Sequence, residues 1–423
     1  MKFHSVVLLL VGIMPGIGWG QLPQPTPVPA APSQPAAPSQ SAPPPLQLEP
    51  MAPSPTLTLV GPTAPVPAGP PAAPAAQCQF HAEYLYWWLK VPQSPPLLTT
   101  SRPEDQGILG RPSTQILAGG GGGNFENIMG VRLGVAWFCD PSLTVELGGS
   151  YLSNGGRYPT YLRQNLAVPY FDPTTQTFTS LELSNSLGAT GYAAVQTYAQ
   201  LWEMAAQAVL PTTLGATQPV DLLLGLRYVQ LFEDLRLWTY TQNNATVLVQ
   251  GHPAPLGTKY AGFDQFQTKN QFYGAQAGMR FHNRCDQWSF EGTALVAVGV
   301  NQQELEIKGQ TNVNVPPSAT QTGNIFSEQT NIGRYNRDVF AVIPQGQVKV
   351  GYQLFETIRL TGGCDLLYWS DVVRPGNQIQ AAVNPSLIPM LNQTVQGVPL
   401  PQPTFQRSDL WLVGLSVGME LTF

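Results

Sequence analysis

The residue types that could do catalytic chemistry are present in this chain but scattered. A run of glycines, Gly119 to Gly123, has the composition of a phosphate-binding loop, but no Gly-Lys-Ser or Gly-Lys-Thr follows it, so it predicts a flexible loop. The four histidines lie far apart along the chain: His4, His81, His252 and His282. A zinc site or a His-based triad needs a tighter grouping. We therefore expect no enzyme, no cofactor and no metal site.

The cysteines offer one candidate bond. Cys78, Cys139, Cys285 and Cys364 are too few and too scattered for a disulfide scaffold, and they lack metal-finger spacing. Cys78 begins the first expected strand and Cys139 ends the second, so antiparallel pairing of these strands would bring the two thiols close. A bridge between Cys78 and Cys139 and two free thiols are the alternatives.

A third group consists of charged side chains that recur at alternate positions. Each shares its parity with small or polar neighbours, whereas the opposite parity is apolar. Successive side chains of a strand point to opposite faces, so these charges should lie together on the polar faces of strands. They are Arg132, Glu146, Glu203, Arg227, Glu291, Lys349, Arg359, Asp365 and Glu420.

The strands that would position these charges are clearest at the C-terminus. In the segment from Asp409 to Phe423, every odd position from Trp411 onward is apolar. The even positions begin with Leu410 and Leu412, and from Gly414 onward they are small or polar. The runs Phe125 to Trp137 and Leu143 to Tyr151 alternate in the same way. Only a few residues separate them, which predicts a hairpin.

Such segments number about ten, and the connections between them alternate between short and long. The long ones are rich in Pro, Gly, Asn, Gln and Thr: Val91 to Asn124, Ser153 to Ser186, Gln242 to Gly262, Gly309 to Asn336 and Val372 to Gln406. Single-chain outer-membrane barrels have an even strand number, short periplasmic turns and long external loops. The sequence therefore predicts an all-β fold, an antiparallel transmembrane β-barrel of about ten strands, closed because lipid cannot hydrogen-bond an open edge.

Composition agrees with this fold. Only 11% of the residues are charged, against roughly 25% in an average soluble domain, while the chain has 41 glycines and 42 prolines. The net charge of −5 and the lack of any Lys or Arg cluster argue against a nucleic-acid partner. No apolar run is long enough for a transmembrane helix, since even Val220 to Leu226 contains Asp221.

The N-terminal part predicts export. Lys2, an apolar run over residues 6–13 and small residues at Gly18 and Gly20 indicate a signal peptide over residues 1–20, cleaved before Gln21. Residues 21–76 are almost entirely Pro, Ala, Ser, Thr, Gln and Val, which predicts a Pro/Ala-rich disordered linker. Contact with the cell wall is the alternative role for this linker. Residues 78–423 then form the barrel, in the cell outer membrane.

Several motifs resemble the putative beta barrel porin-7 family, the porin-like outer-membrane β-barrel proteins of planctomycetes. They are Ala82-Glu-Tyr-Leu-Tyr-Trp-Trp-Leu-Lys90, Gly225-Leu-Arg-Tyr228 followed by Glu233, Thr268-Lys-Asn-Gln-Phe-Tyr-Gly-Ala-Gln276, Val350-Gly-Tyr-Gln-Leu354, Leu367-Tyr-Trp-Ser370 and Arg374-Pro-Gly-Asn-Gln378. The resemblance implies a barrel. It carries over no catalytic or binding residue.

These observations leave the activity open between a small number of hypotheses. An isolated Arg or Lys facing lipid at the midplane costs ~2–4 kcal/mol, so the alternating charges should face the interior. There they either line a pore or form an ion-paired core that plugs the barrel. We favour the plug, because ~8 strands leave an interior just wide enough for side chains and ten add little.

The leading hypothesis is thus a structural or surface-interaction role, and the alternative is a porin for small solutes. A secreted soluble β-protein, or a hydrolase using a loop carboxylate such as Asp172, is less favoured. The expected partners are outer-membrane lipid and the barrel-assembly machinery, for which Phe423 is the expected C-terminal signal. The solute and the oligomeric state remain undetermined.

Overall fold

The computed structural model describes residues 78–121, 125–186, 188–214, 218–244, 247–249, 252–254, 256–314, 318–391 and 393–423. The predicted signal peptide (residues 1–20) and linker (residues 21–76) lie outside these ranges. Within them, no helix combines the length and the apolar character needed to cross a membrane.

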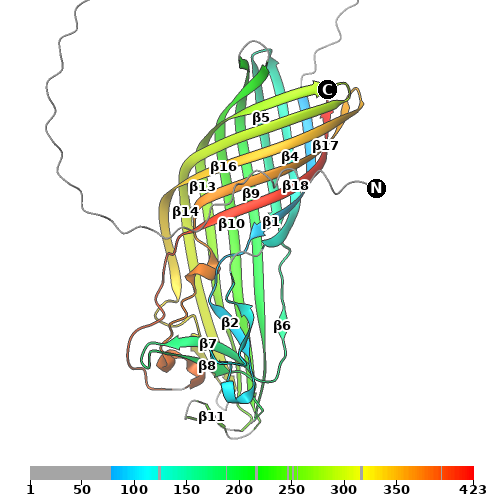
Figure 1. The fold of residues 1–423 in the computed structure, drawn as a ribbon. Coiled ribbons are helices and arrows are strands. Elements are labelled where there is room, and N and C mark those ends of the chain that lie inside the picture. The colour runs from blue at the N-terminus through cyan, green and yellow to red at the C-terminus, as the bar shows by residue number, and fades with distance from the viewer. Residues whose placement is uncertain are drawn as a thin grey trace, which may run out of the picture. The chain divides into compact units, whose positions relative to one another are not determined.

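Ten antiparallel strands pair in a closed ring (Figure 1). In order they are β1 (Cys78–Lys90), β4 (Phe125–Asp140), β5 (Leu143–Ser153), β9 (Ala189–Leu214), β10 (Gln218–Asn243), β13 (Lys259–Cys285), β14 (Trp288–Asn314), β16 (Gly333–Phe355), β17 (Ile358–Val372) and β18 (Ser408–Thr422). Strand β18 closes the ring against β1, with Phe80 opposite Leu421. Cys78 and Phe423 exchange two backbone hydrogen bonds of 3.0 and 3.2 Å at that seam. The predicted fold class is confirmed.

Short and long connections alternate around the ring, as predicted. Consecutive strands of a hairpin are joined across residues 141–142, 215–217, 286–287 and 356–357, and the other connections are long. Two of the predicted long loops are too wide, however. Strands β10 and β13 leave only residues 244–258 between them, and β14 continues to Asn314. Residues 309–314 are nearly all small or polar on both faces, which removes the period-2 contrast that marks a strand.

The long connections carry smaller elements. They are β2 (Pro96–Thr100), η2 (Pro103–Asp105), β3 (Gln115–Gly119), β6 (Thr160–Tyr161), β7 (Leu166–Asp172), β8 (Thr177–Glu182), β11 (Val247–Val249), β12 (His252–Ala254), β15 (Ala319–Thr322), η3 (Pro375–Gln378), η4 (Pro385–Leu387) and η5 (Pro389–Leu391). Strands β3, β2, β7 and β8 form a separate sheet in that order. The predicted glycine loop therefore begins inside strand β3, where Gly119 has φ +75°, while its last two glycines lie outside the described residues.

Strands β9, β10, β13 and β14 continue well past their neighbours and support the long connections (Figure 1). Their inner face in this extension is apolar, with residues such as Val195, Leu237 and Phe266. These pack with Tyr170 of β7, Phe326 and other loop residues in one buried cluster. We call this part of the structure the cap. Its core explains why the long connections fold instead of remaining irregular, since each buries apolar surface against the extended strands.

A buried acidic pair lies within the cap. Asp264 accepts hydrogen bonds from the backbone N–H groups of residues 325–327, from Ser327 Oγ and from Asn324 Nδ2. Burial raises the pKa of Asp264, and these donors oppose the rise by stabilising its ionised form. Glu328 is fully buried, and its carboxylate oxygens accept no hydrogen bond. Burial, and then the charge of Asp264, raise the pKa of Glu328 to about 10.

The Glu328 carboxyl should make stability depend on pH. The pKa of Glu328 is higher in the folded protein than in the unfolded chain. Its contribution to the free energy of unfolding is therefore fully present below pH ~4.5 and is lost as the pH rises toward 10. The loss amounts to at most ~1.4 kcal/mol per pH unit. We expect Glu328→Gln to flatten this dependence and to stabilise the protein by ~2 kcal/mol at pH 8, allowing for an unpaired amide. Denaturant unfolding in detergent from pH 5 to 9 measures the free energy of unfolding of both proteins at each pH. Glu304→Gln, on an exposed ion pair with Arg334, serves as the control and should leave the slope unchanged.

Candidate functional site

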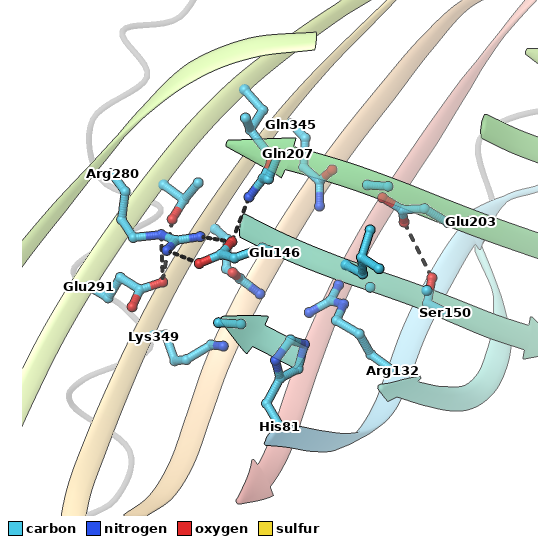
Figure 2. A pocket seen from close by; sticks show the side chains of 18 of the residues that line it. His81, Arg132, Glu146, Ser150, Glu203, Gln207, Arg280, Glu291, Gln345 and Lys349 are labelled. Atoms are coloured by element: carbon cyan, nitrogen blue, oxygen red, sulfur yellow. Dashed lines mark hydrogen bonds and ion pairs between the residues drawn. The ribbon is translucent and has the colours of Figure 1, made fainter. Parts of the chain in front are cut away.

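Polar side chains from nine of the ten barrel strands line one cavity of about 190 Å³ (Figure 2). They come from the buried parity of each strand, at the end where the short turns lie. In β1 this parity includes Gln79 and His81, and in β18 it includes Glu420. We call this space the polar chamber.

Glu83 of β1 is the centre of one ion-pair network in the chamber wall. Its carboxylate lies 2.7 Å from Arg132 Nη1 and 2.6 Å from Lys349 Nζ. Arg132 also contacts Asp365 through Nη2 at 2.9 Å. The side chains of Glu83 and Asp365 are each only 1% exposed, so each carboxylate needs these cations to offset the cost of burial. Lys349 and Arg359 extend the network to Glu420.

A second network lies on the other side of the chamber. Arg280 binds Glu146 with two hydrogen bonds of 2.7 and 2.9 Å, and its Nε lies 3.5 Å from Glu291 (Figure 2). Gln207 donates to Glu146 and so ties β9 into this group. Arg227 and Glu203 form a further pair at 2.7 Å, and Arg227 also donates to Gln345. The chamber therefore contains cations and anions in matched positions, without a field of one sign.

All nine charged residues singled out in the sequence take part in these ion pairs. The sequence reasoning missed two central members, Glu83 and Arg280. The alternation of side chains along each strand could have identified both. Glu83 shares its parity with Leu85 and Trp87 on the buried face of β1, and Arg280 shares its parity with Gln276.

Further along the same inner faces the polar residues give way to an apolar layer. Every barrel strand contributes to it: Leu85, Trp87, Leu89, Ile128, Leu152, Ala199, Leu201, Val229, Leu231, Phe272, Ala297, Ala341, Ile343, Leu367, Trp369, Val372, Leu410 and Leu412. Trp87 and Trp369 are fully buried, and the Phe272 and Trp369 rings meet edge to face at 6.2 Å. The sequence predicts a polar interior, whereas in this half of the strands the interior is apolar.

The last two residues of β17 and the residues after it fold inward against the apolar layer. Residues 371–378, here called the inner segment, begin with Asp371 at φ +51° and include the fully buried Val373. Asn270 of β13 holds Val373 with two hydrogen bonds, donating to its carbonyl at 2.7 Å and accepting from its N–H at 2.8 Å. Asn301 of β14 donates to the Asp371 carbonyl at 2.9 Å. Val372 still pairs with Ser408 of β18, and side chains of β13 and β14 hold the backbone on either side of it.

Arg374 makes the strongest attachment of the inner segment. Its guanidinium binds both carboxylate oxygens of Glu233 in β10, at 2.9 and 2.5 Å, and donates to the Lys90 carbonyl at the end of β1. Arg374 is 1% exposed and Glu233 is 3% exposed. Residues from three motifs that carried the family resemblance, Lys90, Glu233 and Arg374, therefore meet at one buried point. No local pattern could reveal this, since 141 residues separate Glu233 from Arg374.

A second cavity of about 650 Å³ lies against the Glu233–Arg374 pair. Leu89 and Ala199 of the apolar layer line it on one side, and Leu97, Val195 and Leu235 of the cap core line it on the other. The apolar layer therefore has a cavity on each side: the polar chamber, and this second cavity of mixed polar and apolar lining.

The remaining predicted residues, Cys78, Cys139 and Phe423, lie near the end of the barrel where β18 pairs with β1. All four cysteines are free thiols in the structure, so the bridge between Cys78 and Cys139 is not formed in it. The register explains this: Cys78 is opposite Trp137, and Cys139 stands two residues beyond. Phe423 is 63% exposed, and its ring meets Phe80 edge to face at 6.2 Å.

Comparison with known proteins gives one family and several remote structures. Residues 80–423 match the family model described as putative beta barrel porin-7. No curated protein matches the sequence. Among solved structures, the outer membrane protease OmpT from Escherichia coli has a TM-score of 0.37 at 10% identity, covering 82% of this chain and 97% of that one. A Pseudomonas aeruginosa FadL homologue has a TM-score of 0.21 at 7% identity, covering 82% and 90%. These scores support no functional argument.

Proposed function

The chain belongs to the putative beta barrel porin-7 family, which has a porin-like outer-membrane barrel fold. We propose that its lumen is blocked and that the protein has a structural or surface-interaction role. The observation that carries the proposal is the apolar layer, to which all ten strands contribute buried side chains. Water and ions cross such a layer poorly because burying a charge in apolar surroundings is costly. The inner segment adds a second obstacle on the cap side of the same layer.

The cap supports the surface role. Its loops pack around a hydrophobic core of their own, so their exposed side chains are held in fixed positions. Fixed loops on a rigid barrel are the usual place for binding residues. We propose no catalytic role, because the carboxylates, the arginines and the lysine that line the chamber are matched in ion pairs.

Passive diffusion of small solutes is the second candidate. The polar chamber favours it, because opposed charges around a lumen are also how porins are lined. In this proposal the chamber would be the conducting path, and the apolar layer would have to open.

Planar-bilayer recording separates the two candidates. We expect the purified full chain to insert and to give no steady single-channel steps, because the apolar layer remains closed. Insertion is checked on the same sample by heat-modifiable migration in detergent. Steady, reproducible steps from inserted protein would refute the closed barrel and support the porin.

We further propose the route and surroundings of the protein. Residues 1–20 act as the export signal, the outer-membrane lipid surrounds the barrel, and the assembly machinery recognises the exposed Phe423. Residues 21–76 serve as a linker that can contact the cell wall. The apolar side chains on the outward face of the strands support contact with lipid; Leu226 is 69% exposed and Val417 is 67% exposed.

A further inference from the structure

Four aromatic side chains gather on the outward face of the extended strands. Tyr192 of β9 is directly opposite Tyr240 of β10, and their rings stack at 5.1 Å with a 21° interplanar angle. Trp238 of β10 is directly opposite Phe263 of β13, with ring centroids 5.1 Å apart. We call these four residues the aromatic platform. Tyr192 is 43% exposed and Trp238 is 39% exposed, so the rings are not core residues of the cap.

The aromatic platform lies outside the lipid-facing part of the barrel. Along the outward face of β14 the residues are apolar up to Val300, and Gln302, Glu304, Glu306 and Lys308 follow. Phe263 is opposite Gln310, eight residues beyond Gln302. At ~3.3 Å per residue and the usual tilt, this places the platform roughly 20 Å beyond the hydrocarbon edge. Exposed aromatics in water at that height need a reason other than lipid contact.

Polar groups surround the rings. The Arg236 guanidinium lies 5.2 Å from the Trp238 ring centre and 5.5 Å from that of Phe263, and its Nε is buried with no hydrogen-bond partner. Trp238 Nε1 donates to Gln196 Oε1, and the Tyr240 hydroxyl donates to Gln242 Oε1. Flat aromatic faces bordered by amides and a guanidinium suit a sugar, because a pyranose has an apolar C–H face and a rim of hydroxyl groups.

The size of the aromatic platform also favours a sugar over a protein. Three strands ~4.8 Å apart and three rows of side chains give an area on the order of 300 Å². A stable protein interface buries ~800 Å² on each partner. The platform therefore holds a few sugar rings but is too small for a protein partner.

The direction of the face identifies the source of the sugar. The platform continues the outward face of the barrel, since Trp238 has the same parity as the lipid-facing Leu226 in a strand without a register shift. It therefore faces sideways, toward molecules that stand beside the barrel in the outer leaflet. We propose that the platform binds the sugar chain of an outer-leaflet glycolipid, an inference that rests on the proposed outer-membrane location.

Binding of core oligosaccharide released from lipopolysaccharide tests this proposal. The full chain in detergent is titrated by calorimetry with that oligosaccharide, with sugar-free lipid A and with maltohexaose. We expect the oligosaccharide to bind, Trp238→Ala to weaken it about tenfold, and Trp238→Phe to retain most of the affinity because the ring remains. Lipid A binding should not respond to either change.

Trp411→Ala is the matched control. Trp411 is also 39% exposed and also faces an aromatic partner, Tyr368 at 4.7 Å, but on the lipid-facing part of the barrel. It should leave oligosaccharide affinity within about twofold. No binding to the wild type, equal losses in Trp238→Ala and Trp411→Ala, or preference for maltohexaose would each overturn the proposal. A conducting barrel would refute the proposed function without changing these affinities, so the two failures are distinguishable.

Discussion

Arg374→Met is expected to destabilise the protein by about 3–5 kcal/mol, because it leaves the buried Glu233 carboxylate without its partner. The guanidinium also holds the Lys90 carbonyl, so the substitution removes the link between the inner segment and two strands at once. Denaturant unfolding in detergent measures the loss. Hydrogen exchange should rise specifically over residues 373–378, which follow the last pairing of β17 with β18 and are attached through side chains of other strands.

Two further variants show whether the effect comes from the buried pair. Replacing both partners, Glu233→Met with Arg374→Met, should recover much of the loss, because no charge is then left buried and unpaired. Arg334→Met removes a guanidinium that is 63% exposed in its pair with Glu304, and should change stability by less than ~1 kcal/mol. Equal effects of Arg374→Met and Arg334→Met would contradict the role given to the inner segment.

Val417→Arg is expected to impair membrane insertion, by ~2–4 kcal/mol, because this side chain is 67% exposed on the lipid-facing side of β18. Ser416→Arg should be less damaging. Ser416 is 3% exposed and opposite Gly363, on the face that also holds Glu83 and Asp365, whose carboxylates can pair with a new guanidinium. Its cost is crowding in a packed interior.

The heat-modifiable fraction of each variant, after folding into lipid vesicles, measures insertion. Wild type and Ser416→Arg should give mainly the fast-migrating folded form, and Val417→Arg mainly the slow form. If the two arginine variants fold equally well, or if Ser416→Arg is the worse of the two, the assignment of faces in β18 is wrong.

The strand faces could be read from the sequence because they depend on a local property. In β18 the alternation from Asp409 to Phe423 predicts the lipid-facing and buried sides, and the structure has the same sides. Long loops and tight turns are also local, since they depend on Pro, Gly and polar residues between periodic runs. This was enough for the fold class and for nine of the charged residues of the polar chamber, although Glu83 and Arg280 were missed.

The sequence was less informative where the environment changes along a strand. The same inner face passes from Glu83 in the polar chamber to Trp87 in the apolar layer, although the alternation is unbroken. In β13 the outward face passes from lipid at Tyr273 to solvent and then to Phe263 of the aromatic platform. Parity tells which side a residue faces, and the height along the barrel decides what it meets there.

By itself the sequence determined the strands, their two faces and the alternation of their connections, because these follow from the period of the backbone and from turn chemistry. Only the tertiary structure decided which charges pair, where the apolar layer lies, and that Arg374 reaches Glu233 through a loop expected to lie outside. Those features depend on strand register and ring closure, which join residues far apart in the chain at spacings that no local pattern records.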